Sequence, residues 1–381
     1  MKASVYIPSD IIEEILFFIQ ADHCTPNNQL TYHVGPTLYS CLLINHQWCR
    51  LVVPKLWKHP FYYAWKGSGN EKLISTILSF LKETLRKPLI CNGFVLPSIS
   101  QGSTFDYISM IKHLHYDYML TSVESWCKNL VNSSGNNNVS MIIKVILRLF
   151  VDKSVELTSL FIWPNNVYLR HYNLNKYMEL VEPEFNGLLK NLMSLHVETH
   201  SHYPSAKFLQ KLSLIVRNVK KIHLRTPLLG LKGFPNGMEA GIAKNLCTLI
   251  QSQTKLEEFK LMSSFKFTPS FISSLSVHTD HLKSVALFET KIDEVDSWKV
   301  LTNCLNLERF EIINCVGLHS DFISLFYNVN NFKKLKWISM EKNQPNEINE
   351  ELKTCAIHKY KDDLRFRLLK SGKIFLQVTH S

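Results

Sequence analysis

The chain has 381 residues, of which 45% are hydrophobic, so it is long enough for two ordinary domains or one elongated domain with an extensive core. Its 13 glycines and 14 prolines are too few for a disordered chain or for glycine-rich cofactor loops. The formal charge of +11 would suit nucleic acid, but the lysines are dispersed and form no contiguous run, so we expect no nucleic-acid partner.

Nine cysteines without a CxxC pair indicate reduced thiols, which are typical of a cytoplasmic or nuclear protein. The apolar run near the N-terminus contains Asp10, Glu13 and Glu14, unlike a signal peptide. The most apolar stretch, residues 141–151, is interrupted by Lys144 and Arg148, so we expect no membrane partner.

Residues 1–60 predict three short helices. The first follows Pro8, with Asp10 as a candidate capping residue, and has a broad apolar face. A second apolar cluster includes Leu38 and Leu42, and a third begins at Trp48, with Pro54 bending or ending its helix. A unit this small buries little surface by itself and usually needs a partner.

The segments "IPSDIIEEIL" (7–16) and "LYSCLLINHQWCRLVVPKLWKHP" (38–60) resemble the F-box. Ile7 and Pro8 stand at the Leu-Pro position of that family, and Trp48 and Trp57 match its second half. F-box proteins bind the helical adaptor Skp1, which links them to a cullin scaffold and a RING ubiquitin ligase. The resemblance therefore implies a helix face that binds the groove of another protein.

The resemblance also implies which side chains contact the Skp1-like adaptor. All of them are apolar and lie on the three predicted helices or directly before the first one: Ile7, Pro8, Ile11, Ile12, Ile15, Leu16, Leu42, Trp48 and Leu56.

Residues 61–150 are expected to contain connecting helices and possible early repeats. We predict one helix over 71–87, a worn repeat strand in "KPLICNGFVLP" (87–97), a surface loop over 132–140 and a core helix over 141–151.

Residues 151–381 contain seven hexamers with the pattern apolar-x-x-apolar-x-apolar. They begin at positions 157, 192, 219, 256, 282, 307 and 332. Most of these spacings lie near the 20–29 residues of leucine-rich repeats, with two longer insertions. We therefore predict an α/β solenoid with a parallel sheet on its concave face, closed by a strand or cap in 364–379.

Alternate residues of the predicted strands face away from the helices and are candidates for binding a target protein. They mix aromatic, basic and acidic groups, which suits a protein surface: Phe161, Trp163, His196, His223, Arg225, Lys260, Phe288, Arg309, Glu311 and Lys336.

No catalytic constellation is evident, and we expect no cofactor. His196, His200 and His202 have a spacing compatible with a metal, but no HExxH motif accompanies them, so we expect no metal site. The expected function is a non-catalytic, substrate-recognition subunit of a Skp1–cullin–F-box ubiquitin ligase.

An alternative is a repeat scaffold that binds a partner without any ligase. Its N-terminal helices would cap the solenoid, with Ile11, Ile15 and Trp48 buried against residues near 61–90.

Overall fold

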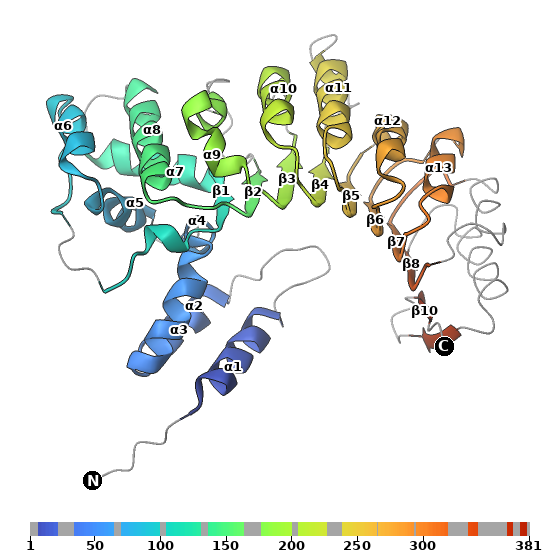
Figure 1. The fold of residues 1–381 in the computed structure, drawn as a ribbon, viewed down its shortest axis with the longest axis horizontal. Helices are drawn as coiled ribbons and strands as arrows, with labels where there is room; N and C mark the ends of the chain where they lie inside the picture. The colour runs from blue at the N-terminus through green and yellow to red at the C-terminus, as the bar shows by residue number, and fades with distance from the viewer. Residues whose placement is uncertain are drawn as a thin grey trace. The chain divides into compact units, whose positions relative to one another are not determined.

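The structure is a computed structural model of the whole chain, which divides into two compact units, Met1–Leu157 and Thr158–Ser381. Each unit is described by itself (Figure 1). The residues described are 7–21, 34–64, 70–99, 104–130, 136–163, 177–199, 205–226, 238–264, 266–292, 295–318, 334–341, 364–368 and 374–378.

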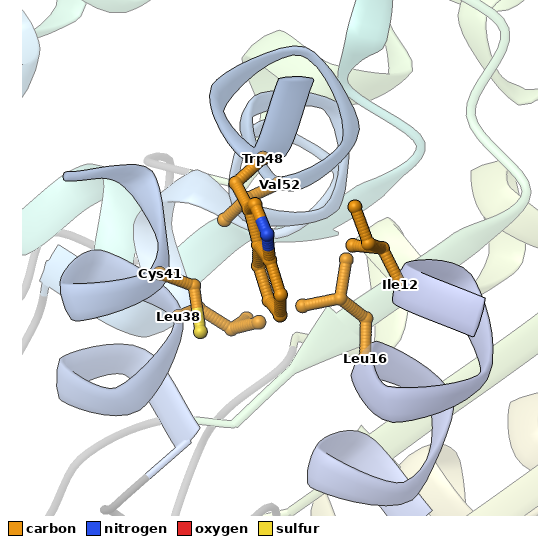
Figure 2. Packing of buried hydrophobic residues seen from close by; sticks show 6 residues of the cluster. All are labelled: Ile12, Leu16, Leu38, Cys41, Trp48 and Val52. Carbon is orange, nitrogen blue, oxygen red and sulfur yellow. The ribbon is translucent and has the colours of Figure 1, made fainter. Parts of the chain in front are cut away.

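The first unit begins with three short helices that share one core: α1 (Ser9–Ala21), α2 (Val34–Leu42) and α3 (His46–Trp57). Ile12 and Leu16 of α1 point toward Trp48 and Val52 of α3 and toward Leu38 of α2 (Figure 2). These side chains are buried, with Trp48 at the centre of the cluster. The predicted three-helix arrangement is therefore present.

Polar contacts set where these helices begin. The Asn45 side chain accepts a hydrogen bond of 3.0 Å from the backbone N–H of Trp48, which caps α3. Nε2 of Gln47 donates to the carbonyl of Ile7 at 2.8 Å and so ties α3 to the start of α1. Because α1 begins at Ser9, Asp10 lies inside the first turn, and our prediction of Asp10 as the capping residue is wrong.

The rest of the first unit is mostly helical. It contains α4 (Pro60–Ala64), α5 (Asn70–Ser79), α6 (Glu83–Cys91), the short helix η1 (Ile108–Met110), β1 (His113–His115), α7 (Tyr116–Leu130) and α8 (Asn136–Asp152).

Three local predictions for this region need correction. The helix predicted over 71–87 is two helices, α5 and α6, separated at residues 80–82. The predicted repeat strand over 87–97 is the end of α6 followed by irregular chain. Residues 136–140 of the predicted loop belong to α8, because Val139 continues the apolar face of that helix. The core helix over 141–151 is confirmed.

The second unit is built on one sheet. Seven strands pair in parallel and in chain order: β2 (Ser159–Ile162), β3 (Ser194–Glu198), β4 (Lys221–Arg225), β5 (Glu258–Met262), β6 (Ser284–Phe288), β7 (Arg309–Ile313) and β8 (Trp337–Glu341). Equivalent hexamer positions are paired, for example His196 with His223 and Lys260 with Ala286. The predicted parallel α/β repeat arrangement is confirmed.

Helices connect successive strands and lie on one side of the sheet (Figure 1). They are η3 (Met178–Val181), η4 (Pro183–Phe185), α9 (Asn186–Leu189), α10 (Ala206–Ile215), α11 (Met238–Gln251), α12 (Thr268–Ser273), η5 (Ser274–His278) and α13 (Val295–Thr302). Leu195, Ile222 and Phe259 represent the strand residues that are buried on this side. We call the opposite side of the sheet the open face.

A turn repeats after the strands β5, β6 and β7. Its first residues, Ser263, Glu289 and Asn314, adopt positive φ angles of 52°, 52° and 57°. The residue that follows each of them is small, polar or sulfur-containing and fully buried, as Thr290 and Cys315 illustrate. Their side chains are 3.2 Å apart and link neighbouring repeats.

The last predicted hexamer is misplaced by three residues. We assigned it to 332–337, but β8 begins at Trp337, and Leu335 and Ile338 of "LKWISM" (335–340) are buried. Trp337 pairs with Arg309 and Ser339 with Glu311. Ser339, rather than Lys336, therefore occupies the middle outward position of this repeat.

The described C-terminal strands close the sheet with antiparallel pairs. β10 (Ile374–Val378) pairs with β8 on one side and with β9 (Leu364–Leu368) on the other. Of the two alternatives predicted for 364–379, a closing strand or a cap, the structure has closing strands, which form an antiparallel pair. The reversal of direction ends the series of parallel repeats.

Candidate protein-binding surfaces

The outer side of α1 carries large apolar side chains that the first unit does not cover. Ile11 and Ile15 are 44% and 38% exposed, and Phe17 and Phe18 are exposed beside them. Ile11, Ile15 and Phe18 are spaced i, i+4 and i+7, which places them on one side of the helix. We call these four residues the apolar surface of α1. Contiguous apolar surface of this kind is typical of a docking site.

The structure divides the residues predicted to contact the adaptor into three groups. Ile11, Ile15 and Pro8 are exposed. Partly buried positions that pack against the helical core are Ile7, Leu42 and Leu56. The core itself contains Ile12, Leu16 and Trp48, which point inward and so are not available on the surface of this unit.

Sequence reasoning missed several exposed apolar residues of the same three helices. Phe17 and Phe18 were left out, although the spacing of Phe18 from Ile11 would have identified it. Tyr39 is also exposed, and Leu43, directly after α2, is 80% exposed. No helical period marks Leu43, because α2 ends at Leu42.

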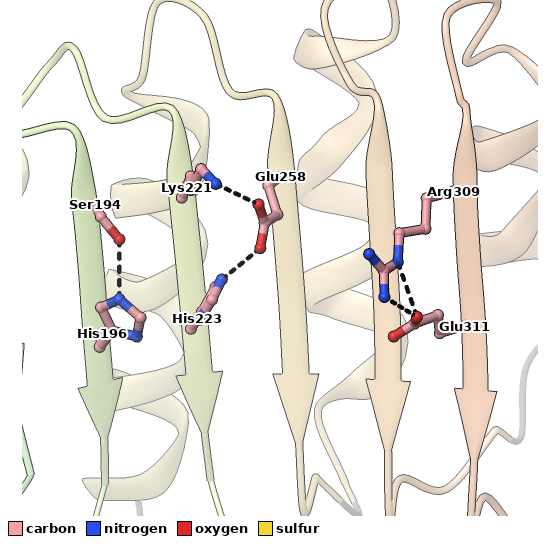
Figure 3. A network of polar contacts seen from close by, with 7 residues as sticks. All are labelled: Ser194, His196, Lys221, His223, Glu258, Arg309 and Glu311. Carbon is pink, nitrogen blue, oxygen red and sulfur yellow. Dashed lines mark hydrogen bonds and ion pairs between the residues drawn. The ribbon is translucent and has the colours of Figure 1, made fainter. Parts of the chain in front are cut away.

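The open face of the sheet holds a polar network (Figure 3). Glu258 on β5 accepts from His223 at 2.8 Å and from Lys221 at 3.0 Å, both on β4. On β3, the Ser194 hydroxyl is 2.9 Å from Nε2 of His196, and on β7 Nε of Arg309 donates to Glu311 at 2.8 Å.

Burial within this network changes how its groups titrate. Burial lowers the pKa of His223, although Glu258 partly offsets the effect. Burial would raise the pKa of Glu258, but hydrogen bonds and charges from His223 and Lys221 outweigh it and lower that pKa to about 2. At neutral pH Glu258 is therefore a carboxylate that accepts hydrogen bonds from His223 and Lys221.

Charged side chains also fill the part of the open face over β5 to β7. Nζ of Lys260 lies 4.5 Å from the centre of the Phe288 ring. Burial lowers the pKa of Lys260, and the charge of Glu311 opposes that effect. Arg225 on β4 donates to Glu198 on β3 at 3.2 Å. Most charges of this face therefore have partners on adjacent strands.

These contacts correct the expected availability of the target-binding residues. The middle residues of four strands are buried, because their side chains pack against those of adjacent strands: His196, His223, Lys260 and Glu311. Phe288 is also buried. The exposed or half-exposed positions among the candidates are Phe161, Trp163, Arg225, Arg309 and Lys336.

The candidates at one end of the sheet are aromatic. The rings of Phe161 and His196 are stacked with centroids 4.2 Å apart, and the Trp163 ring is 5.9 Å from Phe161 at a steep angle. The open face thus changes from aromatic at β2 to charged at β4 and beyond, a mixture that suits a polypeptide surface.

Lys336 lies one residue before β8 and does not occupy the middle outward position of that repeat, which belongs to Ser339. It donates to Glu308 at 3.0 Å. The equivalent position before β6 is Lys283, which donates to Glu257 at 2.9 Å, and Glu257 also lies 3.6 Å from Lys220. Charges of opposite sign therefore alternate along the edge where the strands begin.

Three histidines of the first unit form a cluster that the sequence did not reveal. The rings of His59 and His113 are stacked at 3.8 Å, and His115 lies 5.0 Å from Tyr62. Burial lowers the pKa of His113 and His115 to about 3 and that of His59 well below its usual value. No group of three or more histidine, cysteine or acidic residues suited to a metal occurs in the described part of the chain.

Three of the described cysteines have thiols that burial makes harder to ionise. Burial raises the pKa of Cys127 and Cys304 to about 12 and that of Cys247 to about 11. Cys49 packs within the three-helix unit and is partly buried. His200 and His202, considered above as metal ligands, lie outside the described residues.

Comparison with known proteins found a structural similarity but no match in sequence. No family model matches the chain, and no curated protein matches its sequence. Among solved structures, the chain is similar to the leucine-rich repeat-containing protein LegL7 from Legionella pneumophila. That likeness covers 66% of this chain and 91% of the other, with 14% identity and a TM-score of 0.32. Among the described residues, no helix is long and apolar enough to span a bilayer.

Proposed function

We propose that this protein is an F-box-type substrate-recognition subunit of a Skp1–cullin–RING ubiquitin ligase. The apolar surface of α1 binds a Skp1-like adaptor, and the open face of the repeat sheet binds the target protein. The protein contributes no catalytic group. It raises the local concentration of target lysines near the ubiquitin-carrying enzyme.

The exposure of Ile11 and Ile15 is the single observation that carries this proposal. The same helix buries Ile12 and Leu16. Helix α1 therefore has two apolar sides, one that packs in the core and one that is exposed. Covering an aliphatic side chain of this size contributes about 1.5–3 kcal/mol, less in proportion to the part already covered. A partner protein with an apolar groove accounts for the outer side.

Co-purification of the full-length chain with a Skp1-like adaptor tests the assignment. Wild type should retain the adaptor and, through it, the cullin. Ile11→Asp combined with Ile15→Asp should lose both, because two carboxylates would be buried in an apolar contact. Glu14→Asp, an exposed and conservative change on the same helix, is the matched control and should behave as wild type. Failure of wild type to bind would exclude the ligase role.

A repeat scaffold without a ligase is the second candidate, favoured by the parallel sheet alone. It required Ile11, Ile15 and Trp48 to be covered by residues near 61–90. Ile11 and Ile15 are exposed, and Trp48 packs among α1, α2 and α3, which favours the ligase assignment over the scaffold.

A further inference from the structure

The second unit carries a groove that is lined by none of the residues of its open face described above. It has a volume of about 630 Å³ and runs between the segment of η3, η4 and α9 and the end of α10. Lys211, Leu214, Ile215 and Asn218 line one wall. Lys211, Leu214 and Ile215 are spaced i, i+3 and i+4, which places them on one side of α10, and Asn218 follows in the chain after the helix.

The groove combines an apolar wall with unpaired positive charge. Leu214 is 66% exposed, which is unusual for a leucine in the middle of a repeat. Lys190, Lys211 and Arg217 also line the groove, and within the described part of the chain none of them forms a salt bridge. This contrasts with the open face, where the charges are paired across strands.

The groove also offers side-chain amides for backbone groups. Asn186 and Asn218 both line it. The buried Oδ1 atom of Asn186 has no hydrogen-bond partner among the described residues. Oδ1 of Asn218 accepts from the hydroxyl of Thr254 at 3.2 Å, which leaves its amide N–H groups to donate to the C=O groups of an extended peptide.

No carboxylate lines the groove among the described residues, although Glu182 and Glu184 lie in the neighbouring segment. We infer that this groove binds an extended protein segment in which acidic residues alternate with large apolar ones. The carboxylates would meet Lys190, Lys211 and Arg217, while an apolar side chain would cover Leu214 and Ile215. A nucleic-acid backbone would use the cations but leave the apolar wall exposed.

Fluorescence anisotropy with the full-length chain tests this inference. The probe is a labelled eight-residue peptide of alternating glutamate and leucine, with glutamate–serine and lysine–leucine peptides as comparisons. We expect the glutamate–leucine peptide to bind most tightly and to weaken as salt is added. Equal binding of either comparison peptide, equal binding of a single-stranded oligonucleotide, or no binding of any probe would overturn the inference.

Variants locate the binding on the chain. Lys211→Glu combined with Arg217→Glu should weaken binding by about tenfold or more, because two attractive contacts become repulsive. Lys190→Glu, at an exposed position, should weaken it less, and Leu214→Ser should weaken it without changing its salt dependence. Lys207→Glu, near the other end of α10 and outside the groove, should leave it unchanged. Wild-type affinity in the double variant and in Leu214→Ser would contradict the assignment.

Two more variants distinguish peptide binding in the groove from adaptor binding and from self-association. Ile15→Asp, which removes the proposed adaptor contact, should leave peptide binding intact, so the two proposals fail independently. Concentration-dependent dimerisation that Leu214→Ser abolishes would identify a second copy of the chain as the occupant and would overturn the inference.

Discussion

The three-helix unit α1–α3 and the repeat sheet differ in how their outer surfaces are composed. Each has a buried apolar core, but their outer surfaces differ. The helices leave Ile11, Ile15 and Phe18 exposed, whereas the sheet pairs its outward charges, as Glu258 does with His223 and Lys221. Exposed apolar side chains favour a partner that covers them and excludes water. A polar face whose charges already pair with one another favours a partner with complementary charges at matching positions.

Lowering the pH should produce the largest difference in stability between the two regions. Burial keeps His59, His113 and His115 of the first unit neutral when folded, with the pKa of the latter two at about 3 against 6.5 when unfolded. Between these values the unfolded chain binds more protons, so stability is complete above pH 6.5 and is lost as the pH falls. Hydrogen exchange in α4 and α7 should accelerate with acidification more than intrinsic rates predict.

His59→Phe combined with His113→Phe preserves a stacked aromatic pair but cannot take up protons. It should reduce the pH dependence of exchange in α4 and α7, with the remainder due to His115. An unchanged pH dependence in this variant would show that the histidine cluster is not responsible.

A large-to-small substitution in the core of the three-helix unit should have the next largest effect on stability. Trp48→Ala removes the side chain around which Ile12, Leu16 and Val52 pack, and should reduce the free energy of unfolding of α1–α3 by about 3–5 kcal/mol. Phe18→Ala, on the outside, should change it by no more than about 0.5 kcal/mol. Hydrogen exchange in α1 and α3 measures both. Comparable losses would mean that Phe18 is not on a free surface.

The smallest effects should come from the charges of the sheet, and they should be graded by burial. Glu258→Gln weakens a partly buried site with two donors and should cost about 1–3 kcal/mol. Glu257→Gln, at the edge between Lys220 and Lys283, should cost about 0–1 kcal/mol. Chemical denaturation compares them, and a larger cost for Glu257 would reverse our ranking of the open face and the strand edge.

Periodic features could be predicted from the sequence, and irregular ones could not. The hexamers located β2 to β7, since every strand begins two residues into its hexamer, as at Ser194 and Lys221. The last hexamer failed because "FKKLKW" and "LKWISM" overlap and both fit the pattern, so only pairing with β7 distinguishes them. The histidine cluster was missed because packing brings His59 next to His113 from distant positions.

The candidate surfaces were predicted in part. Helical spacing placed Ile11, Ile12, Ile15 and Leu16 on one broad apolar face, but it could not say which half turns inward. That division depends on where α3 contacts α1, which places Ile12 and Leu16 against Trp48. The burial of Lys260 beside Phe288 likewise depends on the register of β5 with β6.

Titration calorimetry of the purified full-length chain with a Skp1-like adaptor tests the central claim most directly. Wild type should bind with a negative heat-capacity change, the mark of apolar burial. Ile15→Asp should weaken binding by about tenfold or more while the chain retains its unfolding midpoint, because Ile15 lies outside the core. Equal affinity for wild type and Ile15→Asp would contradict the claim that the outer side of α1 is the docking surface.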